Sequence, residues 1–138
     1  MHVLHELAEE HITIMGMLHE VVNLGIITPE AQSTLLAVKS LILSHLKKEN
    51  DQFYPVLRQA AKTDRDLADQ LQAHGRELEA VYGLAFRFFN KYAEGAGGSN
   101  KEFAQELGMI YAALRERIRR EEGYLFKEYE KLISQKKT

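Results

Sequence analysis

The chain has 138 residues, of which 45% are hydrophobic and 28% are charged, and its formal net charge is −2. This length predicts that residues 1–138 form a single domain with one sizeable core. The near-neutral charge excludes a general attraction to nucleic acid or to an acidic membrane surface. Because the chain has no cysteine, disulfide frameworks and thiolate metal sites are excluded, and any metal must be held by nitrogen and oxygen atoms.

The sequence also predicts where the protein works. The sequence contains no run of about 18 apolar residues, so it predicts no membrane span. The N-terminal residues lack the basic segment and apolar run of a secretory signal. A cytoplasmic location is therefore the default expectation.

Apolar residues recur at helical spacing in four segments, and no alternating strand pattern is present. The first predicted helix runs from Leu4 to about Val22. The second begins at Thr28-Pro29, a helix cap followed by proline in the first turn, and runs to about Ala61. Pro55 lies inside this second helix and should kink it, because proline removes a backbone donor.

The third predicted helix follows a cap at Thr63-Asp64 and ends near Glu94. A glycine-rich loop at 95–98 precedes a capping box at residues 99–102, which opens the fourth helix. Four amphipathic helices joined by short connections predict an all-α fold, an up-down-up-down antiparallel four-helix bundle.

Each predicted helix carries polar residues where its apolar stripe should continue. In chain order these residues are His11, His45, Glu49, His74, Arg117 and Glu121. Burying a histidine or a carboxylate is costly unless a partner binds it. Imidazole and carboxylate groups are both ordinary ligands of iron, manganese and zinc. Because these positions can meet near the middle of the bundle, the pattern predicts a buried metal site, with His5 and His19 on the surface.

The residues that carry this pattern resemble the hemerythrin-type HHE cation-binding domain over essentially the whole chain. They are Glu10-His11, His45-Leu-Lys-Lys-Glu49 with Phe53-Tyr54-Pro55, His74, and Glu121-Glu122 with Leu125-Phe126. The resemblance implies a four-helix bundle with a non-heme di-iron centre bridged by two carboxylates. One ion would take His11 and His45 with the bridging residues Glu49 and Glu121, and a second would take His74 with the same bridges. The implied cofactor is one or two iron ions, with manganese or zinc as possible replacements.

Arg117 departs from the family pattern. Residues 117–121 align with His45–Glu49, so that arginine stands where the family has a ligand histidine. A guanidinium is permanently charged and does not normally ligate a metal. Three arrangements are open: Arg117 pairs with Glu121 and one site fills; Arg117 turns outward and Glu77 or Tyr124 completes the second site; or the pocket stays empty. The charged run at 115–120 as a whole predicts a solvated helix face, with ion pairs four residues apart such as Arg117–Glu121.

The leading interpretation is a non-heme iron protein with a mononuclear or dinuclear site, which handles or senses iron, oxygen, nitric oxide or redox state. An open coordination position would meet a small diatomic molecule or peroxide. The alternative is a metal-free bundle that acts as a protein-interaction module, with Arg117 inside and paired to Glu49 or Glu121. A third interpretation is an enzyme that uses a single metal ion for hydrolytic or peroxidatic chemistry, and the sequence does not decide whether the protein is an enzyme.

Overall fold

The computed structural model describes residues 3–93 and 99–136, and the elements found in these ranges are helices. The four long helices are α1 (Val3–Leu24), α2 (Pro29–Lys48), α4 (Arg65–Ala93) and α5 (Asn100–Arg120). Two shorter helices, α3 (Tyr54–Ala61) and α6 (Phe126–Lys136), extend α2 and α5. Glu94 and the predicted loop at 95–98 lie outside the described residues.

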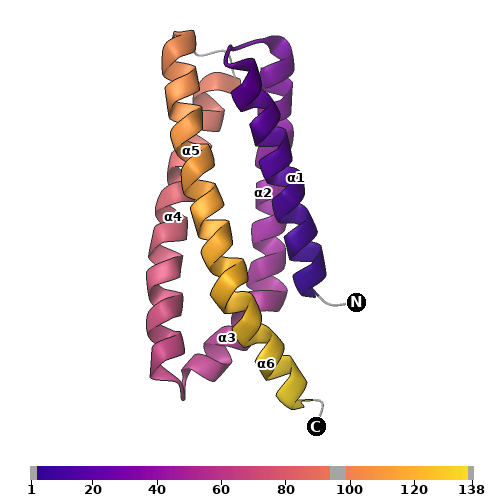
Figure 1. The fold of residues 1–138 in the computed structure, drawn as a ribbon, viewed down its shortest axis with the longest axis vertical. Helices are drawn as coiled ribbons and strands as arrows, with labels where there is room; N and C mark the ends of the chain where they lie inside the picture. Colours follow the sequence, from indigo (N-terminus) through magenta and orange to yellow (C-terminus); the bar gives the residue numbers. More distant parts are fainter. Residues whose placement is uncertain (1–2, 94–98, 137–138) are drawn as a thin grey trace.

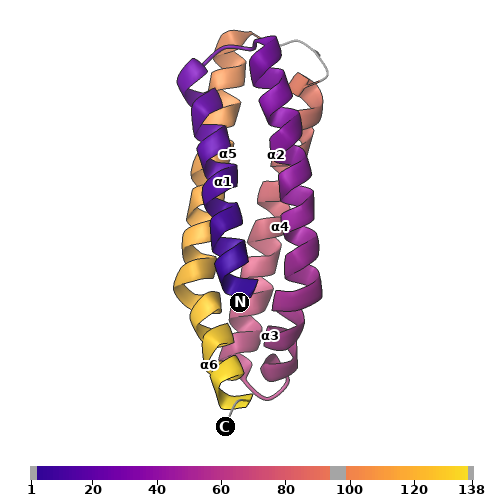
Figure 2. The ribbon, with the colours of Figure 1, turned by 90° about the vertical axis from the view of Figure 1, so that its right-hand side faces the viewer.

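The long helices form the predicted up-down-up-down bundle (Figures 1 and 2). α1 packs against α2 and α5, and α4 packs against the same two helices, so that sequence neighbours run antiparallel. Within the described ranges, none of the helices has the length and apolar character needed to cross a membrane.

The helix starts follow the predicted capping residues. Thr28, Asp64 and Ser99 each accept a hydrogen bond from the backbone N–H three residues later, with distances of 3.0, 3.1 and 3.1 Å. In the turn between α1 and α2, Gly25 adopts a φ of 65°, a left-handed conformation that glycine takes without strain.

A π-helical turn interrupts each half of the bundle at the same relative place. The first, η1 (Glu49–Phe53), joins α2 to α3, and the second, η2 (Glu121–Leu125), joins α5 to α6. The helix does continue past Pro55, as the apolar pattern predicts, and its irregularity lies in the turn just before the proline. No proline accompanies η2, so proline is not the common cause. Such turns occur frequently at functional sites.

The core is divided into two apolar clusters along the bundle. The cluster on the side of the α1–α2 turn includes Leu18, Leu35, Phe89, Phe103 and Leu114. The cluster on the side of α6 includes Leu7, Phe53, Leu57, Leu67 and Leu125. Each long helix, together with its short continuation where it has one, contributes residues to both clusters. The polar residues that interrupt the apolar stripes lie at the boundary between the clusters. The fold therefore brings four sequence-distant segments into one buried polar layer.

Candidate metal centre

All five predicted ligand residues are buried. The exposed fractions are 4% for His11, 1% for His45, 1% for Glu49, 7% for His74 and 3% for Glu121. They come from α1, α2, η1, α4 and η2 respectively. The helical spacing in the sequence therefore identified correctly which polar side chains face the interior.

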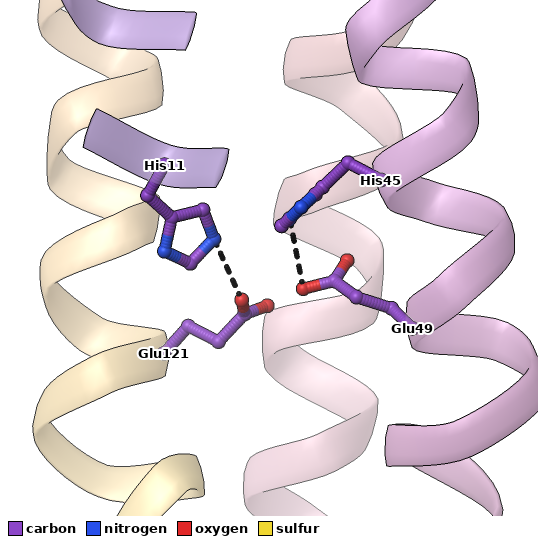
Figure 3. Close-up of side chains that lie close together, drawn as sticks. All are labelled: His11, His45, Glu49 and Glu121. Carbon is purple, nitrogen blue, oxygen red and sulfur yellow. Dashed lines mark ion pairs between the residues drawn. The ribbon is translucent and has the colours of Figure 1, made fainter. Parts of the chain in front are cut away.

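Four of these residues form a compact group, shown in Figure 3. His11, His45, Glu49 and Glu121 each offer one ligand atom, and these atoms all lie within 4.8 Å of one another. Nε2 of His45 lies 3.2 Å from Oε2 of Glu49, and Nε2 of His11 lies 3.2 Å from Oε1 of Glu121 (Figure 3). A ligand atom from each of four converging side chains is the arrangement that a coordinated cation requires.

Outer carboxylates hold both imidazoles in place. Nδ1 of His11 is 2.6 Å from Oε2 of Glu122, and Nδ1 of His45 is 2.8 Å from Oε1 of Glu10. Lys48 in turn donates to the other oxygen of Glu10 at 2.5 Å. An imidazole that donates its Nδ1–H to a carboxylate keeps the Nε2 lone pair free for a metal.

Three of the four oxygens of the central carboxylates lack a hydrogen-bond partner among the described residues, although imidazole nitrogens lie 3.2 Å from two of them. No described residue hydrogen-bonds either oxygen of Glu49 or Oε1 of Glu121. Burial, and then the nearby charge of Glu121, raise the pKa of Glu49 well above its ordinary value. Burial alone would also raise the pKa of Glu121, but the adjacent His11 and His74 imidazoles hold it well below its ordinary value. A cation between these groups would add to the compensation that the imidazoles of His11 and His74 already supply to Glu121.

The surroundings shift the pKa values of the two imidazoles of the group in opposite directions. Burial alone would lower the pKa of His11, but the carboxylates of Glu121 and Glu122 raise it above its ordinary value. Burial, and then the positive charge of His11, lower the pKa of His45. The lowered pKa of His45 favours its neutral, coordinating form, whereas the raised pKa of His11 favours its protonated form.

His74 lies beside the four-residue group and contacts it through one carboxylate. Its Nε2 is 3.2 Å from Oε2 of Glu121, and the hydroxyl of Tyr54 donates to the same oxygen at 2.6 Å. Sequence reasoning missed this role of Tyr54, and also the roles of Glu10 and Glu122. The spacing of Tyr54, five residues after Glu49, could have indicated this role, because residues five apart lie on one face of a π-helical turn.

Arg117 does not pair with Glu121, which corrects the predicted intrahelical ion pair. Its guanidinium, 15% exposed, donates to the carboxylate of Glu77 on α4. Arg120 donates to the same carboxylate at 2.9 Å. The prediction was wrong because helical spacing only showed that Arg117 and Glu121 share a face, whereas α4 offers a nearer carboxylate across the helix interface. Glu77 is thus engaged by two arginines.

A buried layer of histidines and carboxylates in a four-helix bundle defines the class of helical cation-binding proteins. Residues 2–129 match the family described as the hemerythrin HHE cation binding domain. The chain belongs to this family. Comparison with curated proteins and with solved structures found no match.

Proposed function

We propose that the chain binds a single non-heme iron ion between His11, His45, Glu49 and Glu121. The observation that carries this proposal is the fully buried Glu49, which has no hydrogen-bond partner among the described residues while a histidine nitrogen lies 3.2 Å away. Two imidazoles and two carboxylates are a donor set that iron(II), manganese(II) and zinc(II) accept, and histidine with carboxylate in an open site is typical of non-heme iron.

The surrounding residues would fix the ligands before the ion arrives. Glu10 and Glu122 hold the two imidazoles by their Nδ1 atoms. Tyr54 and His74 both contact Oε2 of Glu121 and would hold that carboxylate in place. When bound, the ion would supply Lewis acidity, a one-electron redox couple and an open coordination position for oxygen, nitric oxide or peroxide.

The apolar shell would limit the access of water to the ion. The ring of Phe126 stacks on that of His11, with centroids 5.9 Å apart and planes inclined by 17°. Phe53 is fully buried and contacts Phe126 edge to face. A dry surrounding strengthens the electrostatic interactions of a bound cation and of any small molecule it meets.

The metal-free interaction module is not supported by the position of Arg117. That alternative requires Arg117 to neutralise Glu49 or Glu121, whereas its guanidinium donates to Glu77. The basic groups 3.2 Å from these two carboxylates are the imidazoles of His11, His45 and His74, and not Arg117. The proposal names one ion because four ligand atoms, from His11, His45, Glu49 and Glu121, lie within 4.8 Å of one another, while His74 contacts this group through Glu121.

Anaerobic calorimetric titration with iron(II) tests the proposal, with manganese(II) and zinc(II) as comparisons. Wild-type protein should bind tightly, and Glu49→Gln should lose most of the affinity while keeping its helical circular-dichroism spectrum. Glu9→Gln is the matched control, because Glu9 is an exposed glutamate on the same bundle. Equal affinity of wild type and Glu49→Gln would overturn the proposal.

A further inference from the structure

A cleft of about 520 Å³ lies between α4 and the continuous segment formed by α2, η1 and α3. This volume falls in the range of about 300–1,000 Å³ that small-molecule sites occupy. The walls are mostly apolar or aromatic and include Leu46, Tyr54, Leu71, Leu78, Tyr82 and Phe86. None of the four proposed iron ligands lines the cleft. It is therefore a feature separate from the iron site.

Two tyrosines connect the cleft with the layer of central carboxylates. The hydroxyl of Tyr54 donates to Oε2 of Glu121 at 2.6 Å. Burial, and then the nearby charges of Glu49 and Glu121, raise the pKa of Tyr82 well above its ordinary value. Unlike Tyr54, Tyr82 makes no hydrogen bond to another described residue. A phenol without a partner at the wall of a cleft is a group to which a ligand can hydrogen-bond.

Two glycines keep the α4 side of the cleft open. Both Gly75 and Gly83 line it. Outside the neighbouring backbone of its own helix, a Cβ atom at Gly75 would meet nothing within 4 Å, and one at Gly83 would meet a guanidinium nitrogen of Arg87 at 3.6 Å, an ordinary contact. Glycine weakens a helix interior, and helix packing does not require it at these two positions. The missing side chains leave room for a ligand.

We propose that this cleft binds a small neutral aromatic molecule with one hydroxyl group, which is the phenol class. The rings of Tyr82 and Phe86 stack with centroids 6.2 Å apart and planes inclined by 26°, so they present a nearly flat aromatic wall. A planar ring packs well against such a wall. The ligand hydroxyl would pair with that of Tyr82. The bound ring would then lie beside Tyr54, which holds Glu121.

The charges around the cleft favour a neutral ligand. Behind the two tyrosines, the carboxylates of Glu49 and Glu121 would repel an anion. The walls also carry one exposed cation, Arg58, and one exposed anion, Glu79, whose charges balance. The Arg58 guanidinium already lies over the ring of Tyr54, 5.7 Å from its centroid. A neutral molecule also avoids the cost of placing a charge in a mostly apolar cleft.

A nuclear magnetic resonance titration of the metal-free chain with phenol tests the proposal. The amide signals of Gly75 and Gly83 should shift, with a dissociation constant on the order of 1 mM, as expected for so small a ligand. Toluene lacks the hydroxyl, cyclohexanol lacks the aromatic ring, and benzoate is charged. Each should bind about tenfold more weakly than phenol. Unshifted glycine signals, or equal binding of phenol and any of these three molecules, would overturn the proposal.

Filling the cleft should abolish phenol binding without harming the fold. Gly75→Leu and Gly83→Leu each place a side chain in the cleft and should weaken phenol binding at least about tenfold, because the ligand and the leucine compete for one space. Ala80→Leu is the matched control, since it adds the same side chain at an exposed position of α4. Helical circular dichroism checks each fold. Equal phenol affinity in all three variants would contradict a site in this cleft.

Tyr82→Phe tests the hydrogen bond separately from the space. This variant should still bind toluene, but it should lose the preference for phenol over toluene. An unchanged preference would show that the Tyr82 hydroxyl does not recognise the ligand.

The proposal goes beyond the iron site, because the cleft would bind phenol with or without a metal ion. Repeating the titration on protein incubated with zinc(II) separates the two. Phenol binding by a chain that takes up no metal would support the cleft and contradict the cation site. Metal uptake without any response to phenol would do the reverse.

Discussion

Nε2 of His45 lies 3.2 Å from Oε2 of Glu49, yet no described residue hydrogen-bonds either oxygen of that carboxylate. The two side chains stand one helical turn apart at the boundary between the two apolar clusters. Glu10 accepts a hydrogen bond from Nδ1 of His45, whereas the carboxylate of Glu49 receives none from the described residues. The predictions below on Glu49, Glu10, Glu122 and His45 follow from this difference: the outer nitrogens of the histidines have hydrogen-bond partners, and the oxygens of Glu49 have none among the described residues.

Glu49→Gln should stabilise the metal-free protein at neutral pH. The pKa of Glu49 is higher in the folded chain than in the unfolded one, so the folded state binds the proton more strongly. Stability therefore falls as the pH rises above the ordinary value of 4.5. Glutamine cannot ionise, and we expect a gain of about 1–3 kcal/mol in the free energy of unfolding at pH 7. Urea denaturation at pH 5 and pH 7 measures it, and a loss of stability at both values would contradict the prediction.

The same variant should lose stabilisation by metal. At a concentration about 100 times its dissociation constant, a cation stabilises the wild-type fold by about 2.7 kcal/mol. Glu49→Gln should show little of this effect. Thermal unfolding with and without zinc(II) gives the comparison, and the exposed variant Glu9→Gln should behave as wild type.

Glu10→Gln and Glu122→Gln should each weaken cation binding about 10- to 100-fold, because each removes a carboxylate that orients a ligand histidine. Both residues are only partly buried, so the fold should be retained. Competition against a zinc-binding dye measures the affinities. Unchanged affinity in both variants would show that the Nδ1 contacts play no part in binding.

The fold and the burial of the five predicted side chains followed from spacing in the sequence. Helical periodicity distinguishes inward from outward positions, and each interruption of the apolar stripe by His11, His45, Glu49, His74 or Glu121 is a buried side chain in the structure. The caps at Thr28, Asp64 and Ser99 followed from side-chain chemistry that acts over three residues. Local rules were sufficient for these features.

Contacts across helix interfaces were not predictable in this way. The pairing of Arg117 with Glu77 depends on the rotation of α5 against α4, which spacing within one helix does not fix. The π-helical turn at Glu121 has no proline to announce it, although η1 precedes Pro55. The contacts of Glu10 with His45 and of Glu122 with His11 likewise join residues 35 and 111 positions apart.

Cation binding should release protons and tighten as the pH rises. The pKa of His11 is raised above 6.5 and that of Glu49 well above 4.5. An ion must displace protons from both groups, so a higher pH favours binding until they are fully deprotonated. Calorimetry at pH 6.5 in two buffers of different ionisation enthalpy counts the released protons. A binding enthalpy independent of the buffer would contradict this.

Arg117→His should raise the number of bound ions if the arginine is the only obstacle to a second one. The substitution removes a permanent charge and adds an imidazole on the face of α5 that contacts Glu77. Arg119→His is the control on the exposed face. Elemental analysis of both variants decides, and an unchanged metal content in Arg117→His would show that other features of the cavity also exclude a second ion.

The metal content of the wild-type chain, compared with that of His45→Ala, is the measurement to make first. Protein produced in iron-supplemented medium and reconstituted anaerobically should contain about one iron per chain, as expected for four ligands that converge on one point. His45→Ala should contain almost none, while His19→Ala, which changes an exposed histidine, should match wild type. Wild-type protein without iron after reconstitution, or equal iron in wild type and His45→Ala, would contradict a cation site at these residues.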